Sequence, residues 1–370
     1  HQTFGREGEF ELFSPGRVNL IGEHIDYCGG QVMPMAIDMG TSCVGAASSD
    51  HRLRLYSTRF EEMVELDVDA LPDTALGHWS DYAVGVARML HADDLRGLDL
   101  WIDDNIGAGG LSSSASFSVA VALALLHVAG RYPAVEDSEA RLDLAGQCRR
   151  AENEFVGVSC GIMDQASVAL GGTVLLDCGT LAFERVDADF NDYRLVIMDT
   201  GKERTLAVSA YNERVRETRR IAETLGIANL CELPEDRLAR ALDTLDDEVL
   251  KRRLRHLVTE QQRVMAAKTV LNRGDLVAFG ELMSESHRSL AEDYEVTGPE
   301  LDTMVHLALD QPGVPGARMT GAGFGGCAIA LIARDRVEET TGRVAEGYRK
   351  RTGLMPRFFP VVASPAAQLR

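Results

Sequence analysis

The sequence has 370 residues, of which 45% are hydrophobic and 26% are charged, and its formal net charge at pH 7 is −19. This length and composition predict a soluble globular protein of two domains, each with its own core. The acidic balance argues against nucleic acid and against an anionic membrane as partners, because both would repel the protein. The longest apolar runs are shorter than the about 20 residues that a membrane-spanning helix needs.

Seven cysteines are scattered along the chain, without a Cys-x-x-Cys pair or a Cys/His cluster of zinc spacing. Such a set is typical of reduced thiols in a cytosol. The N-terminal stretch HQTFGREGEF has no signal-peptide pattern. We therefore expect a cytoplasmic protein, and we expect it to be a monomer.

The first half of the chain predicts a mostly antiparallel sheet, because short alternating apolar and polar stretches follow one another. Leu53 and Leu55 on either side of Arg54 are one example. The run 15–30 is instead dense in polar, charged and glycine residues and is unsuited to a core. Strands are expected over residues 8–14, 31–38, 41–49, 53–57, 63–68 and 98–104, with a helix over 82–91.

The second half predicts two strands and then a long helical part. The pattern over 139–156 indicates an amphipathic helix that ends near Gly157, and another helix is expected from residue 160. Strands are expected over 173–177, 194–199 and 358–362, helices over 205–225, 247–272, 274–290, 299–309 and 335–350, and a glycine-rich turn with an apolar strand within 316–332. We predict an α+β protein with domains at residues 1–195 and 196–370, since strand-rich and helix-rich parts meet there.

The stretch NIGAGGLSSSASFSVAV at residues 105–121 is a glycine-rich loop that leads into an apolar helix. The first N–H groups of a helix lack internal partners and lie at the positive end of its dipole, so such a loop can bind an anion, with phosphate the first choice. No lysine follows the glycines, so the charge would come from the helix and from a metal, with Ser114 as a magnesium ligand. The alternative is an ordinary loop with a helix cap.

Two polar clusters could carry chemistry. SPGRVNLIGEHIDYCGG places Arg17, Glu23, His24 and Asp26 close together, which suits a ligand with several hydroxyls or, equally, a solvated loop. The second cluster is a pair of carboxylates near helix ends, Glu152 and Asp164. One could complete a magnesium shell while the other accepts a proton from a hydroxyl nucleophile, although exposed acids at helix ends would look the same.

Taken together, these segments resemble the GHMP kinases, and within them the galactokinases. The resemblance is carried in order by GRVNLIGEHIDYCGG, GAGGLSSSAS, AENEFVGVSCGIMDQ, SESHRSLAEDYEVTGPELD and TGAGFGGC, and extends over about residues 11–363. It implies the two-domain GHMP kinase fold, with a ribosomal protein S5 domain 2-like N-terminal domain and a ferredoxin-like C-terminal domain. It also implies transfer of the γ-phosphoryl group of ATP to the anomeric hydroxyl of α-D-galactose.

The resemblance also implies roles for individual residues. Asp164 would be the catalytic carboxylate beside the sugar O1, with Arg17 as its cationic partner, which favours the ionised form. Galactose would be bound by Glu23, His24, Asp26, Gly161 and Tyr211. ATP would be bound by Gly107, Ala108, Gly109, Gly110, Leu111, Ser112, Ser113 and Ser114. Mg²⁺, the expected cofactor, would be bound by Ser114 and Glu152. The TGAGFGG turn would either close over the cleft or support the phosphate loop.

Some positions depart from the galactokinase pattern. HIDYC replaces the common HTDYN, a variant similar to that of N-acetylgalactosamine kinases, and in MDTGKER Asp199 and Gly201 replace residues that are usually asparagines. The alternatives are therefore an N-acetylgalactosamine or arabinose 1-kinase and, from another class, a non-catalytic sensor of galactose and ATP. Trp79 is either a wall of an adenine site or a core aromatic.

Overall fold

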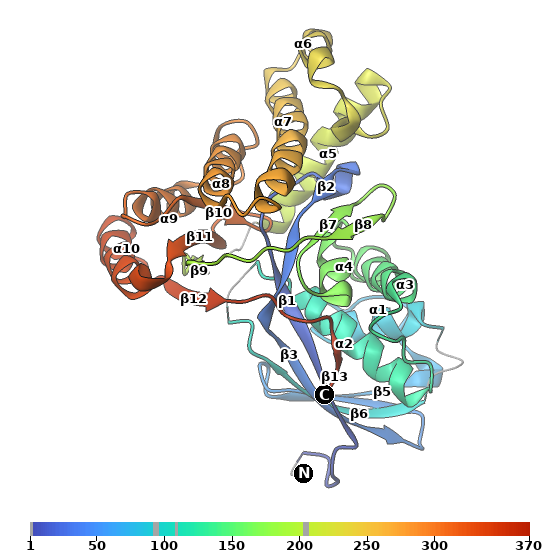
Figure 1. Cartoon of the computed structure of the whole chain (residues 1–370). Coiled ribbons are helices and arrows are strands. Elements are labelled where there is room, and N and C mark those ends of the chain that lie inside the picture. The colour runs from blue at the N-terminus through green and yellow to red at the C-terminus, as the bar shows by residue number, and fades with distance from the viewer. Residues whose placement is uncertain (1–2, 92–95, 108–109, 203–206) are drawn as a thin grey trace.

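The computed structural model describes residues 3–91, 96–107, 110–202 and 207–370 (Figure 1). Two of the predicted phosphate-binding residues, Ala108 and Gly109, lie outside this part of the chain. The first sheet has six strands in the order β13-β1-β3-β6-β4-β5, and every neighbouring pair is antiparallel except β4 and β6. The expected mostly antiparallel sheet is confirmed. Its strands are β1 (Phe10–Asn19), β3 (Pro34–Ser48), β4 (Arg52–Ser57), β5 (Glu62–Asp67), β6 (Gly97–Asp104) and β13 (Gln368–Leu369).

A group of helices covers one face of this sheet. Helix α2 packs against β1, β3 and β6, and the other three helices pack around it. It is apolar on all sides, and Ala115 and the run from Val119 to Leu126 are buried, which suits a helix enclosed by other elements. The helices are α1 (Asp81–Met89), α2 (Ser113–Val128), α3 (Ser138–Arg150) and α4 (Met163–Leu170), and a π-helical turn (Ala151–Val156) follows α3 directly.

The second sheet is antiparallel throughout, in the order β10-β11-β9-β12. Along the chain its strands and helices follow the β-α-β-β-α-β order of a ferredoxin-like unit, with the long helical part after the first strand. The elements are β9 (Tyr193–Asp199), α5 (Ala207–Leu225), α6 (Glu235–Thr244), α7 (Glu248–Leu271), α8 (Leu276–Glu292), α9 (Pro299–Leu309), β10 (Gly316–Thr320), β11 (Cys327–Ala333), α10 (Val337–Thr352) and β12 (Arg357–Val361).

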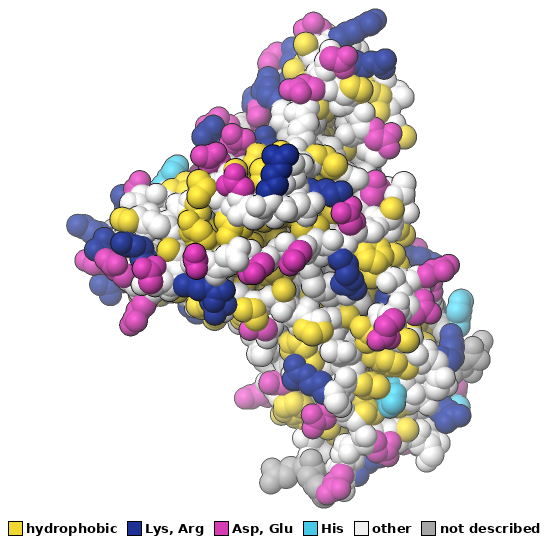
Figure 2. Space-filling model, viewed as in Figure 1, with side chains coloured by type: hydrophobic (Ala, Val, Ile, Leu, Met, Phe, Trp, Pro, Cys, Tyr) yellow, Lys and Arg dark blue, Asp and Glu magenta, His cyan; other side chains and the backbone are white. Residues whose placement is uncertain are grey.

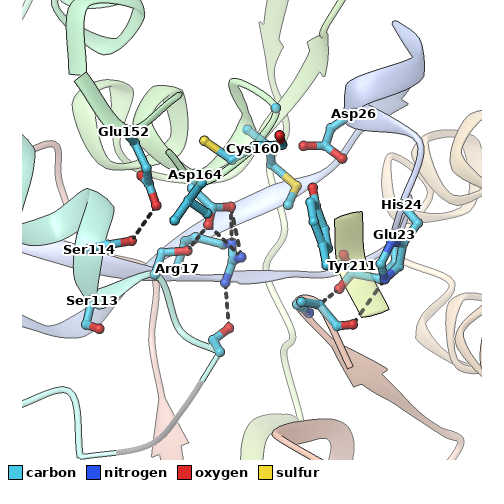
Figure 3. Close-up of a pocket in the computed structure, with 18 residues that line it drawn as sticks. Arg17, Glu23, His24, Asp26, Ser113, Ser114, Glu152, Cys160, Asp164 and Tyr211 are labelled. Carbon is cyan, nitrogen blue, oxygen red and sulfur yellow. Dashed lines mark hydrogen bonds and ion pairs between the residues drawn. The ribbon is translucent and has the colours of Figure 1, made fainter. Parts of the chain in front are cut away.

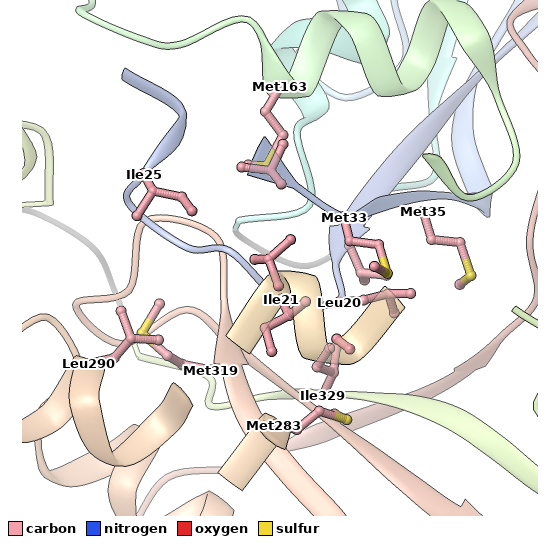
Figure 4. Packing of buried hydrophobic residues seen from close by; sticks show 14 of the residues in the cluster. Leu20, Ile21, Ile25, Met33, Met35, Met163, Met283, Leu290, Met319 and Ile329 are labelled. Atoms are coloured by element: carbon pink, nitrogen blue, oxygen red, sulfur yellow. The ribbon is translucent and has the colours of Figure 1, made fainter. Parts of the chain in front are cut away.

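One hydrophobic core joins the two parts of the molecule. Leu20, Ile21 and Met33 from the N-terminal part belong to the same buried cluster as Met283 and Ile329 from the C-terminal part (Figure 4). A second cluster fills the space between the first sheet and its helices. The remaining elements are a small sheet and short helical turns: β2 (Gln31–Val32), β7 (Val174–Asp177), β8 (Phe183–Arg185), and the 3₁₀ turns Asp26–Cys28, Val68–Ala70, Leu230–Glu232 and Arg334–Arg336.

Several expected elements differ from the structure. The first strand continues through the polar stretch to Asn19, because Arg17 is buried and forms hydrogen bonds with Asp164 inside the protein. Residues 34–48 form one strand instead of two. Helix α6 and strand β10 were not predicted. The predicted division between residues 195 and 196 falls inside β9, and the chain returns at its end to the first sheet, where Leu369 pairs with Leu12. Figure 1 accordingly shows the C-terminal strand β13 at the first sheet.

On the face shown in Figure 2, acidic side chains are interspersed with Lys and Arg, and the basic side chains described there do not gather in one patch. In the described ranges, no helix combines the length and the apolar character that a membrane span requires.

Candidate active site

A cavity of about 270 Å³ lies where the sheet, the helix ends and the C-terminal part meet. Most of the residues that the sequence singled out line it, although they come from separate parts of the chain (Figure 3). The predicted residues on its wall are Arg17, Glu23, His24, Asp26, Gly110, Ser112, Ser113, Ser114, Glu152, Gly161, Asp164 and Tyr211. Gly107 and Leu111 do not line it, and Leu111 is fully buried.

An arginine–carboxylate pair lies in the middle of this cavity. Arg17 on β1 donates from Nε to Asp164 Oδ1 at 2.8 Å and from Nη2 to Asp164 Oδ2 at 2.9 Å, while Ser112 Oγ donates to Oδ2 at 2.5 Å. Arg17 is 4% exposed and Asp164, in the first turn of α4, keeps 30% of its side chain accessible. Charge-assisted bonds of this geometry fix the orientation of a carboxylate. Asp164 is therefore held with an open side toward the cavity.

The same arginine reaches the glycine-rich loop that the sequence predicts to bind phosphate. Its Nη1 donates to the carbonyl of Gly110 at 2.8 Å, and its backbone N–H donates to the carbonyl of Leu111 at 3.1 Å. Ser112, which follows, has a left-handed backbone with φ of 60°, and α2 begins at Ser113. The end of the loop is thus fixed against β1, with the N-terminus of α2 at the cavity wall. This end of the cavity suits an anion.

Glu152 and Ser114 lie on the wall next to that helix end. Ser114 Oγ donates to Glu152 Oε1 at 3.3 Å, and Gln165 Nε2 donates to Oε2 at 2.9 Å. Glu152 belongs to the π-helical turn, a wider turn that is common at functional sites. Burial, and next the charge of Asp164, raise the pKa of Glu152 from 4.5 to about 7. A cation beside this carboxylate would stabilise its charged form and so offset the cost of burying the charge.

Glu23 is held in place at the opposite end of the cavity. Its side chain is 1% exposed, and it accepts hydrogen bonds from Asn19 Nδ2 at 2.8 Å and from the N–H of Gly321 at 2.7 Å. Arg318 Nη1 lies 3.5 Å from Oε1. Burial raises the pKa of this carboxyl, which the charges of Arg318 and Arg17 oppose.

The side chain of Asp26 has room in the cavity wall only because a glycine faces it. A Cβ atom at Gly161 would lie 1.9 Å from Asp26 Oδ2, so only glycine leaves room for the carboxylate. Burial, followed by the charges of Asp164 and Glu23, raises the pKa of Asp26 to about 7. Hydrogen-bond donors from a ligand would stabilise the charged form of this carboxylate.

His24 is neutral, because burial lowers its pKa to about 3. Its Nε2 donates to the carbonyl of Ala322 at 3.2 Å, so Nδ1, 3.0 Å from the hydroxyl of Tyr27, is the acceptor. Its ring lies 5.5 Å from that of Tyr211 and 5.1 Å from that of Tyr294. The result is a rigid, partly aromatic wall at this end of the cavity.

The sequence did not single out part of the lining. Val158, Ser159, Cys160 and Met163 line the cavity, in the loop between Glu152 and α4 and at the start of that helix. Their position in the sequence, between the predicted site residues Glu152 and Asp164, could have identified them. Gly321 and Ala322 also line it, so the TGAGFGG turn forms part of the wall.

The residues that depart from the galactokinase pattern do not line the cavity. Ile25 is fully buried in the core (Figure 4), and Cys28 packs against that core. Asp199 accepts a hydrogen bond from Arg357 Nε at 3.0 Å and another from the N–H of Gly201 at 3.1 Å.

Trp79 also lies outside the cavity lining. Its ring stacks on that of Phe60 at 5.6 Å with an interplanar angle of 8°, and Nε1 donates to Glu62 Oε2 at 2.8 Å. It packs against the core between the first sheet and its helices.

Comparisons with known proteins decide the family. The chain matches the galactokinase galactose-binding signature over residues 1–47, the GHMP kinases N terminal domain over 81–172 and the GHMP kinases C terminal model over 267–350. It is 42% identical to a galactokinase of Streptococcus suis over 96% of this chain and 93% of that protein. The chain belongs to the galactokinase family. It is also 40% identical to a galactokinase of Enterococcus faecalis, over 99% and 97% of the two chains.

Structural similarity agrees with membership of the galactokinase family. The crystal structure of Lactococcus lactis galactokinase complexed with galactose matches with a TM-score of 0.94 and 39% identity, covering 99% of this chain and 97% of that one. The mevalonate kinase of Methanococcus jannaschii, at 18% identity and a TM-score of 0.65, shares the fold. The expected two-domain GHMP kinase fold and an ATP-dependent kinase of the galactokinase family are thus confirmed.

Proposed function

We propose that this protein transfers the γ-phosphoryl group of ATP to the C1 hydroxyl of α-D-galactose, giving galactose 1-phosphate and ADP. The observation that carries the proposal is the Arg17–Asp164 pair between an anion-binding helix end and a wall rich in hydrogen-bonding groups. The galactose-binding signature at the N-terminus and the galactose in the L. lactis structure support this sugar. The placement of Ile25 and Cys28 away from the cavity supports galactose over N-acetylgalactosamine.

In this proposal, the sugar end of the cavity holds and orients the hexose. Glu23 and Asp26 accept hydrogen bonds from sugar hydroxyls, and the rings of His24 and Tyr211 pack against the sugar. The backbone at Gly161 lies against Asp26 on the same wall. Sugar hydroxyls would add hydrogen-bond donors for these carboxylates, above all for Asp26, whose pKa is raised by burial and by the charges of its neighbours. The hexose would then present its anomeric hydroxyl to Asp164.

Asp164 accepts the proton of that hydroxyl as the oxygen forms its bond to the γ-phosphorus and the bond to the β–γ bridging oxygen breaks, which releases ADP. In a loose transition state the nucleophile needs little early activation, so the carboxylate orients the hydroxyl and takes its proton late. Arg17 keeps Asp164 in place and bears positive charge next to the transferred group. Residues 110–114 at the start of α2 would bind phosphate oxygens with backbone N–H groups and hydroxyls.

The residues beside the helix end fit Mg²⁺. A hydroxyl and a carboxylate, Ser114 and Glu152, lie in contact at the cavity wall, and Mg²⁺ is commonly bound by one or two protein oxygens together with phosphate oxygens and water. Among the described residues, no cluster of three or more His, Cys, Asp or Glu side chains could hold a metal. When bound, Mg²⁺ would neutralise charge on the transferred phosphate. A cytoplasmic location and a monomeric state remain predictions.

The test is ATP consumption with Mg²⁺ against galactose, N-acetylgalactosamine, arabinose and glucose, with phosphorus NMR locating the phosphate in the product. We expect a strong preference for galactose and a 1-phosphate. Preference for another sugar would refute the substrate assignment, and sugar binding without turnover would assign the protein to the sensors.

A further inference from the structure

The backbone that carries the sugar-binding residues is held from the opposite side by two side chains of α7. Glu260 Oε1 accepts a hydrogen bond from the N–H of Gly22 at 2.9 Å, and His256 Nε2 donates to the carbonyl of Glu23 at 3.0 Å. The two residues are four positions apart and therefore share one face of the helix. Both side chains are fully buried, and neither lines the cavity.

Each of these groups is fixed by partners of its own. Glu260 also accepts from Ser286 Oγ at 2.6 Å and from Arg263 Nε at 2.8 Å. Burial raises the pKa of Glu260, but nearby charges, that of Arg263 first, lower it to about 2. The Nδ1 atom of His256 lies 2.9 Å from Ser289 Oγ. Because Nε2 must donate to a carbonyl, Ser289 donates to Nδ1, which fixes the neutral tautomer.

The segment they hold could not keep its shape through local preference. Gly22 has φ of 98° and His24 has φ of 63°, and a left-handed conformation is unusual for a residue with a side chain. Such a backbone persists only where its surroundings determine it. A Cβ at Gly22 would meet Val264 Cγ2 and the Cα of Val32 at 3.0 Å each, so the backbone is closely packed against α7 as well.

We propose that His256 and Glu260 are positioning residues for sugar recognition, which set the backbone of residues 22–24 so that Glu23 and His24 face the cavity. They act through the peptide N–H of Gly22 and the peptide carbonyl of Glu23, which lie on either side of the peptide group between these two residues, without touching the substrate. The inference rests on the proposed function, since it gives residues 23 and 24 the task of binding the sugar.

Ser286→Ala is the milder test of the proposal, because it removes one hydrogen-bond partner of Glu260 and leaves no buried charge unpaired. The matched control is Ser284→Ala on the same helix, whose hydroxyl donates to the carbonyl of Gly280 at 3.1 Å, within the helix itself. Glu260→Gln is the stronger variant. We expect Ser286→Ala to raise the KM for galactose about fivefold, because a Glu260 carboxylate without this bond holds the N–H of Gly22 less firmly, with the KM for ATP changed by less than about twofold.

Equal rises in both KM values, an unchanged KM for galactose, or the same shift in Ser284→Ala would overturn the inference. If the Glu260→Gln variant does not fold, the KM values of Ser286→Ala still decide whether the inference holds. Galactose binding by calorimetry, measured in parallel, separates the two claims. A wild-type protein that binds galactose without turning it over refutes the proposed function, while weaker binding in Ser286→Ala would still support the positioning role.

Discussion

Replacing Glu152 by glutamine should stabilise the ligand-free protein at pH 8. This gain in stability should disappear near pH 4.5. The pKa of this carboxyl is raised from 4.5 to about 7, first by burial and then by the charge of Asp164. A raised acid pKa means that the folded state disfavours the charged form. The destabilisation is therefore absent below pH 4.5, grows between 4.5 and 7, and is complete above pH 7.

The size of the effect follows from the difference between the usual pKa of 4.5 and the raised pKa of about 7. At 1.36 kcal/mol for each pKa unit, keeping Glu152 ionised costs at most about 3 kcal/mol at pH 8, and less than about 1 kcal/mol at pH 5. For a chain of 370 residues with an unfolding entropy of about 2.1 cal/mol/K per residue, the variant should melt at most about 4 °C higher than the wild type at pH 8. Glutamine keeps the shape of the side chain and can still accept from Gln165.

The assay is thermal unfolding of both proteins from pH 4.5 to 8 in buffer without ATP or metal. Glu154→Gln is the control, because this residue lies on the same π-helical turn but is exposed and pairs with Arg150, which lowers its pKa. That variant should show no gain at pH 8. With Mg²⁺ and ATP present the order should reverse, and the variant should need more Mg²⁺ for activity. Equal melting temperatures at every pH, or an unchanged Mg²⁺ requirement, would refute the reasoning.

Asp164→Asn should lower kcat by at least about a hundredfold while galactose still binds, as expected for loss of the proton acceptor, and near-normal turnover in a coupled assay would contradict that role. Gly161→Ala should weaken galactose binding in calorimetry, because the new Cβ would lie 1.9 Å from Asp26 Oδ2; unchanged affinity would show that the carboxylate does not hold the sugar. Ile25→Thr with Cys28→Asn should leave the ratio of kcat/KM for galactose and N-acetylgalactosamine unchanged, since neither residue lines the cavity, and a shift toward either sugar would count against that placement.

Local patterns in the sequence were enough for much of the fold. The glycine-rich loop before α2, the long helices after residue 205 and the antiparallel character of the first sheet all follow from composition and periodicity over short windows. Helix α6 was missed, and the strand β1 was cut short at its polar end. In β1 the polarity of Arg17 indicated a surface, whereas a carboxylate far along the chain pairs with it inside the protein.

The sequence by itself determined which chemical groups are present and, through the galactokinase resemblance, which of them belong together. Only the tertiary structure decided how they meet. Arg17 and Asp164 are 147 positions apart, and Gly22 and Glu260 are 238 apart, yet each pair is in hydrogen-bond contact. No period of 2 or 3.6 residues encodes such contacts, because they arise when separate elements pack on a shared core. The same packing placed Ile25 in the core and away from the cavity, a choice that the motif alone left open.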